Sequence, residues 1–125
     1  MISNVLMVAV GGAVGASMRY LTNVGAGRLF GVGFPAGTVI VNILGSFLMG
    51  LLVVVLAEKG GTRYAPLIMT GFLGGFTTFS AFSLDAVTLY ERGEVVVAAL
   101  YVAGTVIVGI AALVAGMAIG RMVLQ

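Results

Sequence analysis

Neither cysteine nor histidine occurs among the 125 residues, and only 8% of the residues are charged. Without cysteine and histidine the chain cannot form disulfides, thiolate or imidazole metal sites, or the usual pairs of nucleophile and base. We therefore expect that the protein is not an enzyme. Six basic residues against four acidic ones are also too few to make a nucleic-acid-binding surface, so no nucleic-acid partner is expected.

Apolar residues dominate the chain, with 61% of the residues hydrophobic and a mean hydropathy of +1.23. The charged residues separate four long uncharged runs, at 1–18, 29–57, 64–84 and 95–120. A membrane-spanning helix needs about 20 mostly apolar residues, so the sequence predicts an all-α, multi-pass protein in a lipid bilayer. The first run has no basic leading segment and no clear cleavage site, so we expect a span there and not a signal peptide. Residues 1–125 are expected to form a single domain of four transmembrane helices, with spans near 3–23, 34–57, 66–90 and 95–122.

Residues 71–83, GFLGGFTTFSAFS, are poorly suited to a continuous helix. Gly74 and Gly75 each cost about 1 kcal/mol relative to alanine in a helix, and the β-branched Thr77 and Thr78 follow closely. A helix interrupted within a membrane frees backbone amides and carbonyls, which then need protein, water or an ion as partner. Broken helices of this kind are where membrane proteins bind ions. The sequence therefore predicts that the third transmembrane helix is broken at mid-membrane and forms an ion site.

The basic residues do not favour one orientation in the membrane. With four spans they divide equally between the two sides: Lys59, Arg63 and Arg121 against Arg19, Arg28 and Arg92. With three basic residues on each side, the positive-inside rule predicts no preferred orientation. Either another feature sets the topology, or the chain inserts in both orientations and pairs head-to-tail with itself.

The first span combines small residues with an arginine. The spacing Gly11-x-x-x-Gly15 places two glycines on one helix face, where another helix can approach closely. Arg19 follows near the end of the first uncharged run. Its side chain could snorkel to the headgroups or attract anions at the mouth of a pathway. The sequence alone leaves both interpretations open.

Thr38, Asn42 and Ser46 lie four residues apart and form a polar stripe on the second span. An asparagine amide in a membrane needs hydrogen-bond partners. From the residue alone, the favoured interpretation of Asn42 is a hydrogen bond to another helix, which contributes about 0.6–2 kcal/mol. The alternative is that its NH₂ group, with two uncharged donors, faces a permeating anion.

Aromatic and hydroxyl residues continue this polar pattern beyond the expected break. Phe79 and Phe82 share one helix face, and such a pair is usually a packing contact. Aromatic ring edges are electropositive, however, so they could also contact an anion without a formal charge. Four hydroxyl residues are further candidates for an ion pathway: Ser80 and Ser83 beside the phenylalanines, and the pair Tyr101 and Thr105 on the fourth span.

Three segments, GGAVGASMRY, GTVIVNILGSFLMG and GFLGGFTTFSAFS, resemble the signature blocks of the Fluc/CrcB fluoride channel family. The match runs through nearly the whole chain, and the third block is the most specific. The resemblance implies a dual-topology, antiparallel homodimer in a bacterial or archaeal inner (plasma) membrane. It also implies a passive, fluoride-selective ion channel that exports cytoplasmic fluoride and so relieves fluoride toxicity.

The resemblance implies roles for individual residues as well. Asn42 corresponds to the pore asparagine of the family, and Arg19 to its vestibule arginine. Phe79 and Phe82 correspond to the two phenylalanines that face fluoride.

The family also holds a structural sodium ion at the dimer centre. Gly74 and Thr77 correspond to the residues whose backbone carbonyls bind this Na⁺.

The fourth span matches the polar track of the family only in part. Tyr101 corresponds to its aromatic head, and Thr105 comes next along it. Gly109 stands where the track often has serine, and Ala81 stands where the third block often has a hydroxyl residue. The hydroxyls near the break, Ser80 and Ser83 among them, are the candidates to replace these groups.

Two other classes compete with a channel. A small multidrug-type transporter also has four short spans, but it needs a membrane-embedded carboxylate. The only candidate is Asp85, which we expect at the end of the third span. A non-transporting membrane scaffold would explain the glycines, but not polar groups that converge with a helix break. The sequence therefore favours the fluoride channel.

Overall fold

A computed structural model describes residues 1–124, in which all regular structure is helical and no strand occurs. Four stretches are long and apolar enough to cross a membrane: α1 (Ile2–Phe30), α2 (Ala36–Lys59), Thr62–Glu91 and α5 (Val95–Leu124). The prediction of an all-helical chain with four such stretches is confirmed, and these helices indicate a multi-pass membrane protein. Where a bilayer would begin and end along each helix stays a prediction.

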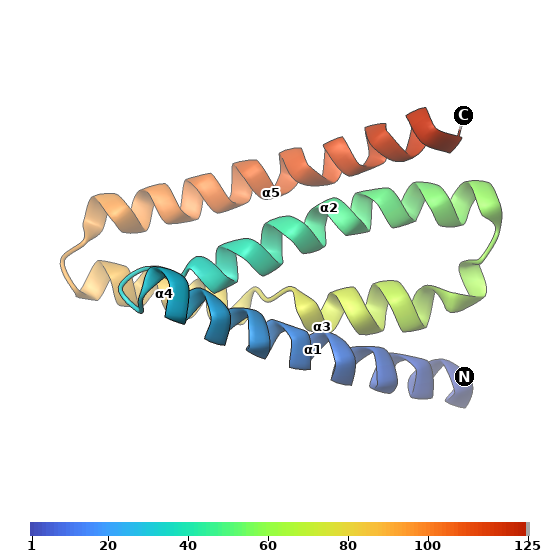
Figure 1. Cartoon of the computed structure of the whole chain (residues 1–125), viewed down its shortest axis with the longest axis horizontal. Coiled ribbons are helices and arrows are strands. Elements are labelled where there is room, and N and C mark those ends of the chain that lie inside the picture. The colour runs from blue at the N-terminus through green and yellow to red at the C-terminus, as the bar shows by residue number, and fades with distance from the viewer. Residues whose placement is uncertain (125) are drawn as a thin grey trace.

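The helical stretches run up and down beside one another (Figure 1). The start of α1 and the end of α5 lie at the same end of the bundle as the loop that follows α2. At the opposite end Arg92 Nη1 donates a hydrogen bond to Gly33 O at 3.1 Å. This bond ties the loop between α1 and α2 to the loop between α4 and α5.

The third stretch is not one continuous helix. It consists of the short η1 (Thr62–Tyr64), the π-helical η2 (Pro66–Leu73), α3 (Gly74–Phe76) and α4 (Ser80–Glu91). The backbone turns extended at Thr77, with φ −84° and ψ 160°, and helix resumes at Ser80. The non-helical link of residues 77–79 is visible between α3 and α4 in Figure 1. The interruption lies near the middle of the stretch, and its depth in a bilayer stays a prediction.

The interruption begins after the two glycines that suggested it. Gly74 and Gly75 are helical, and the link begins at Thr77. The small size of Gly75 serves packing, because a Cβ there would meet Gly12 O at 2.8 Å. Gly75 thus lets α1 approach the broken stretch, and the main chain leaves the helix only beyond both glycines.

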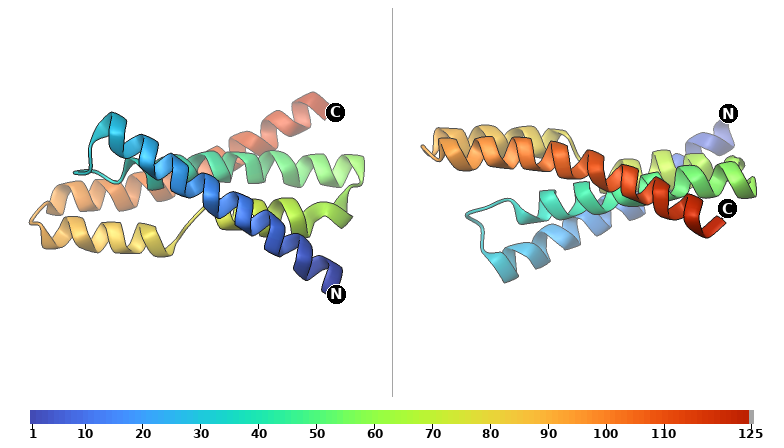
Figure 2. Two further views of the ribbon diagram at one scale, coloured as in Figure 1. Left: turned by 60° about the horizontal axis from the view of Figure 1, so that its bottom comes forward. Right: turned by 90° about the horizontal axis from the view of Figure 1, so that it is seen from above.

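Close contact between main chains holds α1 to the first half of the third stretch. A Cβ on Gly11 would overlap Leu67 O, and a Cβ on Gly15 would overlap Phe72 O. The prediction that this Gly-x-x-x-Gly face packs closely against another helix is confirmed. Figure 2 shows α1 crossing over this part of the chain.

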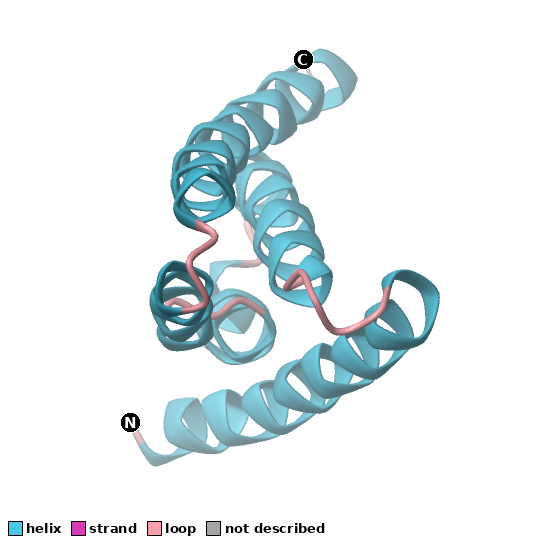
Figure 3. Ribbon diagram, turned by 90° about the vertical axis from the view of Figure 1, so that its left-hand side faces the viewer, coloured by secondary structure: helices cyan, strands magenta, loops and turns pink. Residues whose placement is uncertain are grey.

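Helix α2 packs mainly against α5, again through glycines. A Cβ on Gly50 would overlap Leu113 O, and one on Gly116 would overlap Phe47 O. Viewed along the bundle, α1 and α5 lie on opposite sides, with α2 and the broken stretch between them (Figure 3). Large apolar side chains cover the outside of α1 and α5. Soluble monomers rarely expose such extended apolar surface, so this surface suits lipid.

Arg19 contacts the third stretch from within α1. Helix α1 continues to Phe30, so Arg19 does not lie near a helix end. Its guanidinium is half-buried and hydrogen-bonded to the third stretch. Of the six basic residues, three then remain at one end of the bundle and two, Arg28 and Arg92, at the other. Where Arg19 lies relative to a bilayer stays a prediction, and with or without it the bias between the two ends is weak.

Candidate functional site

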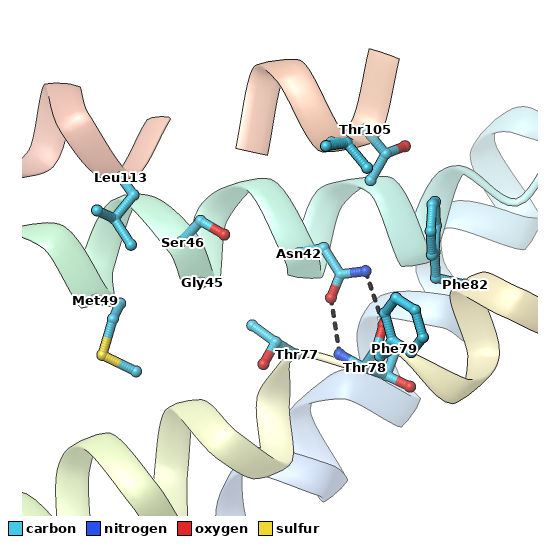
Figure 4. Close-up of a pocket in the computed structure, with 11 residues that line it drawn as sticks. Asn42, Gly45, Ser46, Met49, Thr77, Thr78, Phe79, Phe82, Thr105 and Leu113 are labelled. Atoms are coloured by element: carbon cyan, nitrogen blue, oxygen red, sulfur yellow. Dashed lines mark hydrogen bonds between the residues drawn. The ribbon is translucent and has the colours of Figure 1, made fainter. Parts of the chain in front are cut away.

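A cavity of about 310 Å³ opens beside the helix interruption, between α2, the link, α4 and α5. Figure 4 shows its lining. The cavity is lined by Asn42, Gly45, Ser46, Met49, Thr77, Thr78, Phe79, Phe82, Thr105, Val106 and Leu113. The fold therefore brings four of the predicted pathway residues together: Asn42, Phe79, Phe82 and Thr105. Thr77, predicted for its backbone carbonyl, lies in the same wall.

Asn42 holds the non-helical link to α2. Its Nδ2 donates to Thr78 O at 2.9 Å, and Thr78 N donates to its Oδ1 at 2.7 Å (Figure 4). The interhelical hydrogen bond favoured from the sequence is thus present, and its partner is a main chain freed from the helix. One N–H of the amide is left for another acceptor, since NH₂ carries two donors. Asn42 can therefore hold the link and still offer a donor to the cavity.

The two threonines of the link end one helix and begin the next. Thr77 Oγ1 donates to Leu73 O at 2.9 Å, which completes the last turn before the link. Thr78 Oγ1 accepts from Ala81 N at 3.1 Å and so satisfies one of the free amides at the start of α4. The sequence analysis missed this role of Thr78. A threonine three residues before the amide it caps is the signal that could have revealed it.

Three aromatic rings lead from the surface of the chain into its interior. Phe79 is 78% exposed, whereas Phe82 is 8% exposed, and their ring centroids are 5.8 Å apart. The Phe82 ring lies 5.2 Å from that of Tyr101, which is buried. Phe79 thus lies at the mouth of the cavity, and Phe82 lies between the cavity and Tyr101.

Tyr101 belongs to a polar cluster around Asp85, and this cluster was not predicted. Asp85 Oδ2 accepts from Thr38 Oγ1 at 2.7 Å and from the Tyr101 hydroxyl at 3.2 Å. Asp85 on α4 therefore bonds side chains of α2 and α5, and whether it lies at the end of the membrane span stays a prediction. A second cavity of about 260 Å³ also touches Thr38 and Asp85, with Asn23 in its wall. Asp85 thus remains a candidate for the carboxylate that a multidrug-type transporter would need.

Signals for this cluster are present in the sequence. Thr38 precedes Asn42 by one helical turn, and Asp85 follows Phe82 by three residues, so each lies on the same helix face as a predicted pathway residue. An acidic residue in register with such a face is the clue that could have placed Asp85 inside the bundle.

The remaining predicted residues surround the interruption without lining the cavity. Ser83 Oγ donates to Phe79 O at 3.0 Å, and Ser80 Oγ lies 3.4 Å from Thr78 Oγ1. From α1, Arg19 Nε donates to Gly75 O at 2.9 Å, just before the link. Both earlier interpretations of Arg19 therefore omitted its contact with the main chain of the broken helix.

Two carbonyls of the interruption are available to a ligand. Gly74 is exposed, and neither its carbonyl oxygen nor that of Thr77 accepts a hydrogen bond within residues 1–124. Backbone carbonyl oxygens are hard ligands that suit alkali or alkaline-earth cations. These two carbonyl oxygens therefore suit a sodium ion. Whether any of the predicted residues contacts an ion stays a prediction.

Comparison with known proteins gives one consistent result. Residues 6–117 match the model of the family described as CrcB-like protein, Camphor Resistance (CrcB). A protein of Cereibacter sphaeroides (strain ATCC 17029 / ATH 2.4.9), named fluoride-specific ion channel FluC, is 69% identical over 121 residues, which are 97% of each chain. Proteins with the same name from Ruegeria sp. (strain TM1040) and Paracoccus denitrificans (strain Pd 1222) are 58% and 55% identical, over 99% and 93% of each chain. With the family match and these identities over nearly its whole length, the chain belongs to the CrcB-like family.

Proposed function

We propose that this protein is a fluoride-selective ion channel that conducts passively and lets fluoride leave the cytoplasm, which relieves fluoride toxicity. The observation that carries the proposal is the 69% identity, over 97% of the chain, to a protein named fluoride-specific ion channel. The protein acts as a transporter of ions and not as an enzyme. The cavity beside the helix interruption is the part of the fold that we assign to the ion.

The chemistry of this cavity suits a small anion. A fluoride ion that enters a narrow pore must exchange its water for other hydrogen-bond donors. The second N–H of Asn42 and the hydroxyl of Thr105 are such donors, and the edges of Phe79 and Phe82 add electropositive surface. We expect the pathway to continue past Phe82 to Tyr101. Ser80 and Ser83 lie beside it.

We further propose that two copies pair as an antiparallel homodimer in the inner membrane of a bacterium. Phe79 borders the cavity, and its ring is 78% exposed. A second copy would cover this ring and close the cavity on its open side. The nearly equal numbers of basic residues at the two ends of the bundle would also let copies insert in both orientations.

A sodium ion at the centre of this dimer is the third part of the proposal. The carbonyl oxygens of Gly74 and Thr77 would hold it, because the interruption leaves them without a hydrogen bond within residues 1–124. When bound, the cation supplies positive charge beside the anion pathway and partners for these carbonyls. The chain itself contributes the interruption, which leaves both oxygens without a backbone donor from a following helical turn.

The test is fluoride efflux from liposomes that contain the purified protein. Vesicles are loaded with potassium fluoride or potassium chloride, with a low concentration of sodium on both sides of the membrane. The membrane voltage is removed with a potassium ionophore, and the released anion is measured with an ion-selective electrode. We expect rapid loss of fluoride, retention of chloride, and no fluoride loss from protein-free vesicles. Equal efflux of both anions, or none of either, would contradict the proposal.

Asp85 favours one alternative, since a carboxylate inside the helices is what a proton-coupled small multidrug-type transporter requires. Such a transporter would move protons across the vesicle membrane when a cationic drug is supplied. The proposed channel would not respond to the drug. A pH-sensitive dye inside the same liposomes distinguishes the two.

A further inference from the structure

Helix α1 lies against the first half of the broken stretch with its main chain almost in contact. A Cβ on Gly75 would meet Gly12 O at 2.8 Å and Ala16 N at 3.2 Å. Gly12, Ala16 and Arg19 are spaced by four and three residues, so they share one face of α1. The same face that approaches Gly75 so closely therefore directs Arg19 toward the end of α3.

The guanidinium of Arg19 replaces a hydrogen bond that the broken helix has lost. Arg19 Nε donates to Gly75 O at 2.9 Å, across a sequence separation of 56 residues. In a continuous α-helix this carbonyl would accept from the amide four residues later, which is that of Phe79. Phe79 lies in the non-helical link, so the helical donor is no longer in place. A bond from a charged donor is stronger than one from a neutral donor.

Asn42, on α2, also bonds the main chain at the interruption. It bonds both the N–H and the C=O of Thr78, whereas Arg19 bonds the carbonyl of Gly75. Side chains from α1 and α2 thus bond main-chain groups just before the link and within it. Thr77 lies between these two fixed points and Gly74 directly precedes them, and the carbonyls of both are without a hydrogen bond in residues 1–124.

We propose that Arg19 is a positioning residue, which fixes the shape of the interruption through its Nε–H bond to Gly75. The donor atom carries this role, and the positive charge is secondary to it. By holding Gly75, Arg19 also fixes where the neighbouring carbonyl of Gly74 lies. That last consequence, for a cation, rests on the proposed function.

Two substitutions separate the donor from the charge. Arg19→Gln places Nε2 at the same position along the side chain as the arginine Nε, and so keeps an N–H donor without the charge. Arg19→Lys keeps the charge but has a methylene at that position. Arg19→Met lacks both the donor and the charge. An arginine that acted only by attracting anions would be replaced better by lysine than by glutamine.

The first measurement is hydrogen–deuterium exchange of the full chain in detergent micelles, followed by mass spectrometry. We expect amides within 74–82 to exchange roughly tenfold faster in Arg19→Lys and Arg19→Met, a change that corresponds to about 1.4 kcal/mol. Arg19→Gln should exchange within about twofold of wild type, which is under about 0.5 kcal/mol. Peptides from α5 serve as the reference and should not change. The proposal is overturned if Arg19→Lys exchanges like wild type, or if Arg19→Gln exchanges as fast as Arg19→Met.

The second measurement is the dependence of the melting temperature on sodium concentration. We expect Arg19→Gln to keep the wild-type midpoint, and Arg19→Lys and Arg19→Met to require at least several-fold more sodium. Equal midpoints in all variants would overturn the effect of Arg19 on the cation site. A wild-type protein that does not respond to sodium would instead refute the proposed sodium site, and the exchange data would still decide the role of Arg19.

Discussion

Replacing Asn42 by aspartate exchanges the NH₂ donor for a second oxygen at almost constant volume. The remaining Oδ1 can still accept from Thr78 N, but the new oxygen faces Thr78 O, to which the amide donated at 2.9 Å. A lost hydrogen bond between membrane helices costs about 0.6–1.7 kcal/mol. The carbonyl of Thr78 left without a donor adds about 1–3 kcal/mol. We therefore expect the variant to lose roughly 2–5 kcal/mol of unfolding free energy.

The same substitution should abolish fluoride efflux, because a carboxylate at the cavity wall repels anions. Asn42→Ser is the matched control, since its short side chain also gives up the two bonds to Thr78 but adds no charge. Unfolding free energies are measured by titration with a denaturing detergent, and fluoride efflux is measured in liposomes. We expect both variants to be destabilised, and residual flux only in Asn42→Ser.

Two results would refute this reasoning in different ways. Wild-type stability of Asn42→Asp would show that the bonds between Asn42 and Thr78 do not hold the link. If Asn42→Asp is destabilised but conducts fluoride like wild type, Asn42 is only a structural residue and the ion pathway lies elsewhere.

Three further predictions follow from the exposure and chemistry of the other residues. Phe79→Ile and Phe82→Ile should each greatly reduce fluoride efflux, since isoleucine lacks the electropositive ring edge. The loss of unfolding free energy should stay under about 1.5 kcal/mol, and it should be smaller for Phe79, which is exposed. Fluoride efflux equal to that of wild type in both variants would show that the two rings serve only in packing. Lysines added to the 58–63 loop should bias most copies to one orientation and deplete antiparallel dimers, and full activity of such a variant alone would rule out obligatory antiparallel pairing. Exhaustive replacement of sodium by a large organic cation should stop fluoride efflux or dissociate the dimer. The variant Thr77→Ser keeps the backbone carbonyl and should therefore retain the response to sodium. Undiminished flux and an intact dimer without sodium would show that no cation is essential.

Composition and spacing alone determined the all-helical, multi-pass architecture. Long uncharged runs enter the membrane as helices, because backbone groups in hydrocarbon must form their hydrogen bonds within their own helix. The Gly-x-x-x-Gly face of α1 was equally predictable, since only small residues admit a second main chain at that distance. The segment around Thr77 was recognised as a place where the third helix would be interrupted, because glycine and β-branched residues weaken helix locally.

Only the tertiary structure decided which groups meet at the interruption. Asn42 bonds a main chain 36 residues away, Arg19 one that is 56 residues away, and Thr38 reaches Asp85 across 47 residues. Such pairs depend on how each helix is rotated and how closely it crosses its neighbour, and these quantities follow from packing of whole faces rather than from any local pattern. For the same reason the link begins at Thr77 and not at the glycines. The weakness of the helix is local, but the bonds that hold the freed main chain come from α1 and α2.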